Sequence, residues 1–159
     1  MTVSFRAMQP QDRMFVVSMW SSSYRMSHSA GFISMARWAE VMHREIGRVI
    51  DSPLVATAVA YSPGEPETPD HLYGFISYEE DDDMPSPYVF YVAVKAPYRR
   101  ARSRLGLQRG IAEQLFAAAN IDPRAPFRYA CETPYVMEMR AKIPRAVFDP
   151  IHGRYMVDT

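Results

Sequence analysis

The sequence has little that would support a disulfide, a metal centre or a membrane span. Among 159 residues the single cysteine, Cys131, excludes an internal disulfide and a cysteine-based zinc site. The four histidines are scattered without the spacing of metal ligands. No run of about 18 apolar residues is present, and the first residues lack the apolar core of a signal peptide. We therefore expect no metal, no membrane contact and a cytoplasmic location.

An excess of charge of one sign is also missing. The 18 basic and 18 acidic side chains give a formal net charge of +0, which argues against general nucleic-acid binding. No internal repeat or low-complexity segment occurs. A chain of this length with 48% hydrophobic residues is the size of one domain that can bury a substantial core. We expect a single domain over residues 1–159.

The pattern of apolar residues predicts alternating strands and helices. Extended segments are expected at 3–8, 54–61, 71–80, 88–94 and 127–132, followed by a closing extended pair within 145–158. Helices are expected at 11–26, 34–50, 103–121 and 134–142. We expect the second of these to place its apolar stripe at Met35, Trp38, Ala39, Met42 and Ile46. This order predicts a layered α/β (α+β) fold, with a mixed sheet and helices on both faces.

The most informative segment, 91–115, reads as a buried strand, a basic turn and the start of an amphipathic helix. Pro97 ends the strand. Apolar residues then recur at helical spacing, at Leu107, Ile111, Leu115 and Ala118. We therefore expect the helix to begin at about 103–105. The unpaired N–H groups and positive dipole of a helix start can bind a pyrophosphate. The alternative is a solvated basic loop that caps a core helix.

These residues resemble the GNAT superfamily of acyl-coenzyme A dependent N-acetyltransferases. The likeness rests on the order of elements and on the pattern Val94-x-x-Pro97-Tyr98-Arg99-Arg100 leading into Leu107. It implies a mixed, mostly antiparallel central sheet. It also implies transfer of an acetyl group from acetyl-CoA to a primary amine of a small molecule or protein. Residues 15–25 resemble a helix of small bacteriophage-encoded acetyltransferase-like proteins, which would place the chain in the host cytoplasm.

The resemblance also implies which residues hold acetyl-CoA. Backbone groups of the strand would contact the acetyl and pantetheine portions, at Tyr91, Val92 and Val94. The turn would bind the pyrophosphate, through Arg99, Arg100, Ala101, Arg102, Ser103 and Arg104. The family's turn usually has Arg or Gln, two residues, Gly, one residue, then Gly or Ala. In a register without gaps the two small positions fall on Arg102 and Arg104. Either these arginines point outward and the backbone still donates, or the turn no longer holds coenzyme A.

Catalysis would need a general base and an acid near the same cleft. Glu132 is the first candidate for the base, because ligands bind beyond the carboxyl ends of strands in open α/β sheets. Glu79 and Glu80 are the alternatives. Each carboxylate could equally be an exposed group at a strand end.

For the acid that protonates the thiolate, the resemblance implies Tyr135, with Tyr155 as a second possibility. It implies acceptor contacts at Tyr24 and Arg25. A second class of function stays open at this point. The chain could be a non-catalytic GNAT-like binding or structural module, such as a phage virion or host-interaction component, with a homodimer or another protein as partner.

Overall fold

The computed structural model describes residues 2–24, 34–64, 71–80, 83, 86–99, 109–130 and 134–150. Its centre is a six-stranded sheet in the order β1-β2-β3-β4-β5-β6. The strands are β1 (Ser4–Ala7), β2 (Val55–Tyr61), β3 (Leu72–Glu79), β4 (Tyr88–Val94), β5 (Phe127–Tyr129) and β6 (Ala146–Phe148). The pairs from β1 to β4 are antiparallel, whereas β4–β5 and β5–β6 are parallel. The predicted mixed, mostly antiparallel sheet is confirmed.

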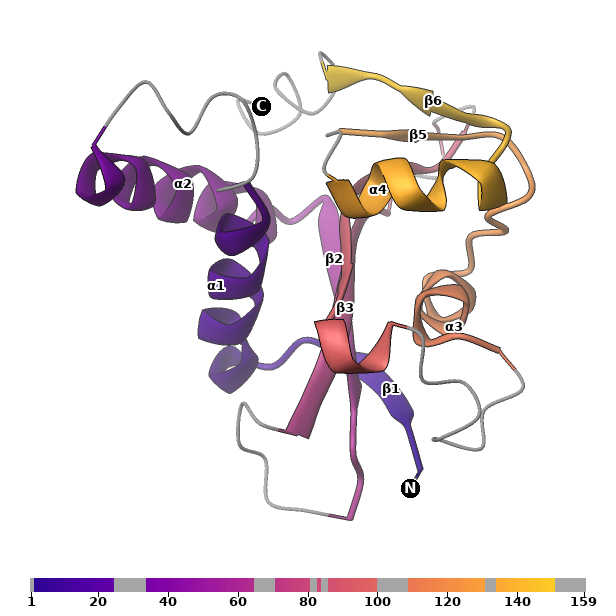
Figure 1. The fold of residues 1–159 in the computed structure, drawn as a ribbon, viewed down its shortest axis with the longest axis horizontal. Helices are drawn as coiled ribbons and strands as arrows, with labels where there is room; N and C mark the ends of the chain where they lie inside the picture. Colours follow the sequence, from indigo (N-terminus) through magenta and orange to yellow (C-terminus); the bar gives the residue numbers. More distant parts are fainter. Residues whose placement is uncertain are drawn as a thin grey trace.

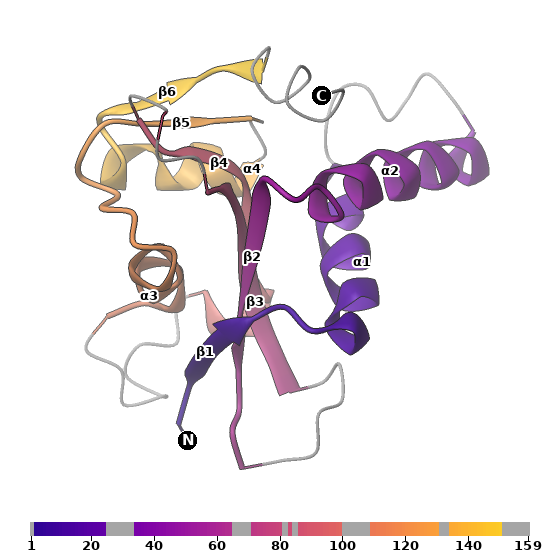
Figure 2. The ribbon, with the colours of Figure 1, turned by 180° about the vertical axis from the view of Figure 1, so that it is seen from behind.

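Helices cover both faces of this sheet. Figure 1 shows α1 (Arg13–Tyr24) and α2 (Met35–Ile50) on one side of the strands, and α3 (Ile111–Ala118) and α4 (Pro134–Met139) on the other. Figure 2 shows the same layers from behind, with β5 and β6 running crosswise to β2 and β3. The layered arrangement agrees with the sequence prediction.

The first two helices form for reasons that are local in the sequence. A short 3-10 turn, Pro10–Asp12, leads into α1, where Val16, Val17 and Trp20 are buried. At the start of α2, the Ser34 side chain accepts a hydrogen bond from the backbone N–H of Arg37, which satisfies one orphan donor of the first turn. Both helices therefore begin within about two residues of the predicted positions.

Burial is uneven along the predicted apolar stripe of α2. Trp38 and Ile46 are buried, whereas Met35 is 50% exposed. Figure 1 shows the reason: the end of α2 that carries Met35 projects away from the sheet, and only the other end approaches β2. Helical periodicity correctly gives the face on which Met35 lies, but not whether another element covers that turn.

Two apolar clusters fill the space between the sheet and its helices. The cluster on the α3 side includes Val92, Leu115, Phe116 and Phe127. The cluster on the α1 and α2 side includes Trp20, Ile46, Phe75 and Tyr91. Every residue of β4 is buried, because this central strand is covered by side chains on both faces.

Candidate functional site

Strand β4 contains a β-bulge in its middle. Tyr91 pairs with Ser77 of β3 and Val89 pairs with Tyr78, so Phe90 is one residue too many for the ladder. As a result, Phe90 and Tyr91 both belong to the cluster on the α1 and α2 side, whereas Val89 and Val92 belong to the cluster on the α3 side. The bulge therefore changes which residues of β4 face each layer.

Next to the bulge, β4 and β5 part. Their ladder consists of the pairs Tyr88–Arg128 and Val89–Tyr129, and the Ala130 N–H then donates to the Val89 carbonyl at 3.0 Å. Beyond Val89, β4 continues to Val94 without a β5 partner among the described residues. A strand edge left open in this way presents backbone groups that a bound molecule can pair with.

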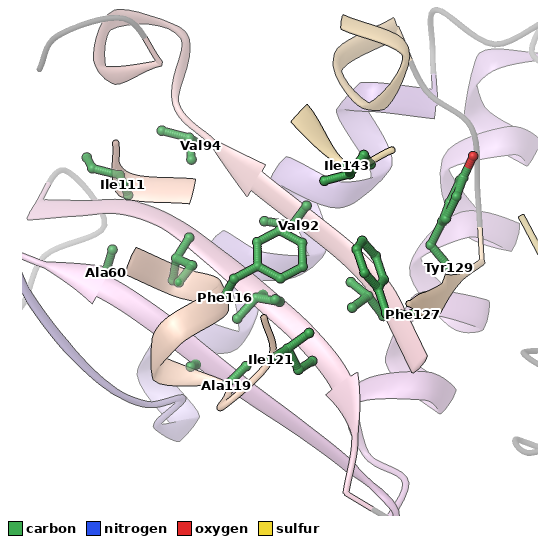
Figure 3. Close-up of a cluster of buried hydrophobic side chains, with 14 of the residues drawn as sticks. Ala60, Val92, Val94, Ile111, Phe116, Ala119, Ile121, Phe127, Tyr129 and Ile143 are labelled. Atoms are coloured by element: carbon green, nitrogen blue, oxygen red, sulfur yellow. The ribbon is translucent and has the colours of Figure 1, made fainter. Parts of the chain in front are cut away.

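An apolar hollow of about 20 Å³ lies at this opening, room for roughly one water molecule. It is lined by Val89, Phe90, Tyr91, Val92, Phe116, Phe127, Tyr129, Met139 and Ile143. Figure 3 shows the side chains of Val92, Phe116, Phe127 and Ile143 gathered on this side of the sheet. Larger grooves of about 470 and 480 Å³ lie outside α3 and at the ends of β1 to β3, and neither is lined by β4.

The closed end of the opening is held by a polar network around Arg128 of β5. Its guanidinium donates to the Ser86 hydroxyl at 3.1 Å and to the Asp149 carboxylate at 3.2 Å. The Tyr88 hydroxyl donates to the Asp149 carbonyl at 2.6 Å. These bonds join β4, β5 and the segment after β6 at one point, so the strands separate from a fixed origin.

The start of α3 corrects the predicted helix. Arg109 and Gly110 are not helical, and the helix begins at Ile111 instead of at 103–105. Gly110 is the N-cap, with φ −63° and ψ 155°, and its carbonyl accepts the Gln114 N–H at 3.2 Å. The helix also ends earlier than predicted, at Ala118, because Asn120 adopts a left-handed φ of 56°.

This correction changes the interpretation of the phosphate turn. The small residues at the helix start are Gly110 and Ala112, which have the Gly-x-Ala spacing of the family pattern described above. The predicted register, which places Arg102 and Arg104 at the small positions, lies outside the described residues. Leu107 falls where the pattern has Arg or Gln. The glycine at the boundary and Glu113 in the first turn were the signals in the sequence that could have located this helix start.

The predicted cofactor residues of β4 lie together at the opening. Tyr91 and Val92 line the hollow, and Val94 ends the strand. Arg99 follows a 3-10 turn, and its Nε donates to the Val94 carbonyl at 2.8 Å, so this arginine holds the end of β4. The other members of the predicted turn, residues 100–104, lie outside the described residues.

The side of the sheet that faces α1 and α2 carries buried polar groups. Trp20 stacks on Tyr91 with ring centroids 5.2 Å apart and planes at 12°. The hydroxyls of Thr57 and Ser77 are hydrogen-bonded at 2.8 Å. Glu79, one of the predicted bases, is only 8% exposed and follows Ser77 by two residues, which places it on the same face of β3.

Most of the other predicted catalytic and acceptor residues cannot be placed. Glu132, Tyr155 and Arg25 lie outside the described residues, and Tyr24 and Tyr135 are described by their backbones only. Glu80 is exposed and its N–H donates to the Leu54 carbonyl at 3.0 Å. The part of the chain that the structure describes contains no group of three or more His, Cys, Asp or Glu side chains arranged to hold a metal ion. Within the same ranges, no helix is long and apolar enough to cross a membrane.

Comparison with known proteins gives a fold but no close relative. No protein-family model and no curated protein matches the sequence. The chain is similar to the structure of a predicted acetyltransferase with acetyl-CoA from Clostridium acetobutylicum. Identity is 12% and the TM-score is 0.51, with 89% of this chain and 88% of that chain covered.

Two further similar structures have lower TM-scores. The ribosomal-protein-alanine N-acetyltransferase from Brucella melitensis has 12% identity and a TM-score of 0.47, with 98% of this chain and 88% of that chain covered. The PaiA N-acetyltransferase from Thermoplasma acidophilum, in complex with coenzyme A, has 16% identity and a TM-score of 0.46, with 76% and 70% covered. The likeness to the Clostridium structure shows that the chain has an acetyltransferase fold, as predicted.

Proposed function

We propose that this protein is an N-acetyltransferase that uses acetyl-CoA and acts on a primary amine. The observation that carries the proposal is the opening between β4 and β5, which starts at the Phe90 bulge. The acetyltransferase fold supports it, because the similar Clostridium structure contains acetyl-CoA. Fold alone does not determine function, so the proposal rests on what this site can bind.

The residues of the opening suit an acyl-coenzyme A. Backbone groups of β4 beyond its last ladder pair with β5, Val89–Tyr129, would pair with the amide groups of the pantetheine arm. The pyrophosphate would lie at the start of α3, where Gly110 and Ala112 keep side-chain bulk away from the first N–H groups. Acetyl-CoA would supply the activated acyl group.

Transfer would join the amine nitrogen to the thioester carbonyl carbon while the C–S bond breaks. Glu79 is the base candidate that the structure describes, and it would accept the proton that the amine loses. Glu132 stays a second proposal for this role, and Tyr135 stays the proposed donor of a proton to the thiolate. Tyr24 and Arg25 stay proposed acceptor contacts. Positioning the two reactants would supply much of the rate.

Binding of acetyl-CoA tests this proposal directly. In isothermal titration we expect micromolar affinity, about −8 kcal/mol. Gly110→Asp should abolish binding, because a carboxylate at the helix start repels the pyrophosphate. It should not weaken the fold, since aspartate is a good N-cap. Gly110→Asn is the matched control, because it adds the same bulk and the same cap without a charge, so it should lose less affinity than Gly110→Asp. No binding to the unmodified protein at millimolar acetyl-CoA would refute the proposal.

The location of the protein and its acceptor are also part of the proposal. We propose a soluble protein in the cytoplasm, of a host cell if a bacteriophage encodes it, as the likeness of residues 15–25 suggests. Acetylation assays with small amines and with proteins would identify the kind of acceptor. A measurement of mass in solution would show whether the chain forms a dimer.

A further inference from the structure

On the α1 and α2 side of the sheet, two buried hydrogen-bond donors have no acceptor within the part of the chain that the structure describes. Trp20 is 3% exposed, and its indole Nε1–H has no partner among the described residues. Thr57 and Ser77 are 8% and 0% exposed, and their only described side-chain hydrogen bond is the one between them. One hydroxyl must donate in that bond, so the hydrogen of the other is left over.

Both donors belong to residues on the same side of the sheet, next to Tyr91. Trp20 stacks on Tyr91 at 5.2 Å and lies 6.1 Å from Phe75. Tyr91 is the cross-strand partner of Ser77, and Phe75 precedes Ser77 by two residues on the same face of β3. The indole therefore covers the sheet immediately beside the Thr57–Ser77 pair. A buried donor that makes no hydrogen bond costs about 1–3 kcal/mol, so two such donors close together cost a substantial amount of free energy.

We propose that these two donors bind a carbonyl oxygen of the acceptor substrate, so that the protein prefers α-amino carbonyl compounds to simple alkylamines. The inference deepens the proposed function and rests on it. A carbonyl oxygen has two lone pairs and no hydrogen of its own, which matches two donors that have no acceptor beside them. A substrate hydroxyl could accept from both donors but would bring a third, so one hydrogen would still lack an acceptor.

The neighbouring Glu79 sets the position of the amine. It follows Ser77 by two residues on the same face, about 7 Å along the strand. The substrate carbonyl must therefore lie within a few bonds of the nitrogen, as it does in an amino-acid amide or at the N-terminus of a peptide. The bulge of β4 brings Tyr91 to this face, so the amine side and the opening for acetyl-CoA meet at one residue.

The test compares two amines in two proteins. Glycinamide carries the carbonyl and propylamine does not. The ratio of their acetylation rates, from release of free coenzyme A at one pH, is measured in the unmodified protein and in Trp20→Phe, which keeps an aromatic ring but removes the N–H. Dividing one ratio by the other cancels the different basicities of the amines. We expect the preference for glycinamide to fall about tenfold in Trp20→Phe, corresponding to one lost donor.

The chain offers a matched control that is also a reporter. Trp38 is the only other tryptophan, is buried on α2 and belongs to neither apolar cluster. Trp38→Phe should keep the unmodified ratio. It also leaves Trp20 as the sole indole, so its emission reports glycinamide binding without any turnover. We expect glycinamide to change that emission at concentrations where propylamine does not.

The outcomes separate this inference from the proposed function. If acetyl-CoA fails to bind but glycinamide changes the Trp20 emission, the proposed function is wrong and the donor site stands as a binding site. If acetyl-CoA binds and amines are acetylated, but Trp20→Phe leaves the ratio unchanged and glycinamide has no effect on the emission, the inference is overturned. The two donors would then hold a buried water molecule.

Discussion

The two faces of the central sheet differ in chemistry although the same strands make both. On the α3 side the buried residues form an apolar cluster in which Phe116 and Phe127 pack with ring centroids 5.4 Å apart. On the α1 and α2 side, the polar residues Thr57, Ser77 and Glu79 are buried on the same face as the cluster that contains Trp20, Phe75 and Tyr91. Buried polar groups cost free energy unless they are hydrogen-bonded. A face that carries several polar side chains can recognise a polar ligand, whereas an apolar face cannot.

The difference suggests that the two faces of the sheet have different roles. We infer that the α3 face holds the fold together and places the helix start at Gly110, whereas the α1 and α2 face recognises the acceptor. If so, variants on the first face should change stability most, and variants on the second should change activity most. Four sets of variants test this difference, and the first should have the strongest effect.

Phe116→Ala should destabilise the protein by about 3–5 kcal/mol, because it leaves a cavity next to Phe127 in the apolar cluster. The measurement is the free energy of unfolding in denaturant. Phe148→Ala is the control, since Phe148 is 43% exposed on β6 and should cost far less. Equal losses from both variants would contradict the assignment of stability to the α3 face.

Glu79→Gln should lower kcat/KM for acetylation by about a hundredfold, because glutamine keeps the shape of the side chain but cannot accept the amine proton. The free energy of unfolding should change by no more than about 1 kcal/mol. Glu80→Gln is the matched control at the next, exposed position. A loss of activity in the control as large as in Glu79→Gln would remove Glu79 from the proposed role.

Thr57→Val should cost about 1–2 kcal/mol of stability, because it leaves the buried Ser77 hydroxyl without its partner. Adding Ser77→Ala should recover most of that loss, since both polar groups are then gone. A double-mutant cycle in denaturant measures the coupling. Additive losses would mean that the two hydroxyls do not depend on each other.

Tyr78 gives the smallest expected effect, seen only at alkaline pH. Burial, and to a lesser extent the charge of Glu80, raises the pKa of Tyr78 above its ordinary value of 10.0. The unfolded chain therefore loses this proton at a lower pH than the folded one, so the stability is fully present below pH 10.0 and is lost as pH rises through the folded pKa. Tyr78→Phe should make the free energy of unfolding decline less above pH 10.0. Curves that superimpose would contradict the prediction.

Much of the fold could be predicted because the relevant signals are local. Apolar runs gave the strands, and β4 was predicted with the bounds it has. The start of α3 was missed because Leu107 and Ile111 are four residues apart, which is helical spacing, although the helix boundary lies between them. Gly110 at that boundary was the better signal, since glycine is tolerated at an N-cap and disfavoured inside a helix.

The arrangement of the site depends on contacts that the sequence does not display. The bulge at Phe90 leaves no trace in the apolar pattern, because β4 is buried on both faces and has no alternation to interrupt. The unpaired donor of Trp20 is equally invisible, since a hydrogen bond that is not made is a property of the folded neighbourhood. Glu79 could be named as a strand-end carboxylate, but its burial beside Ser77 required the structure.

The network at Arg128 has a mechanical consequence. With Ser86, Tyr88 and Asp149 it fixes the point where β4 and β5 separate. The far end of β4 is held as well, by its ladder with β3 as far as the pair Gly74–Val94 and by Arg99. The five residues from Phe90 to Val94 therefore form an edge of about 16 Å that is fixed at both ends. A molecule that binds along this edge meets backbone groups that are already in place, so little free energy is lost in ordering the strand.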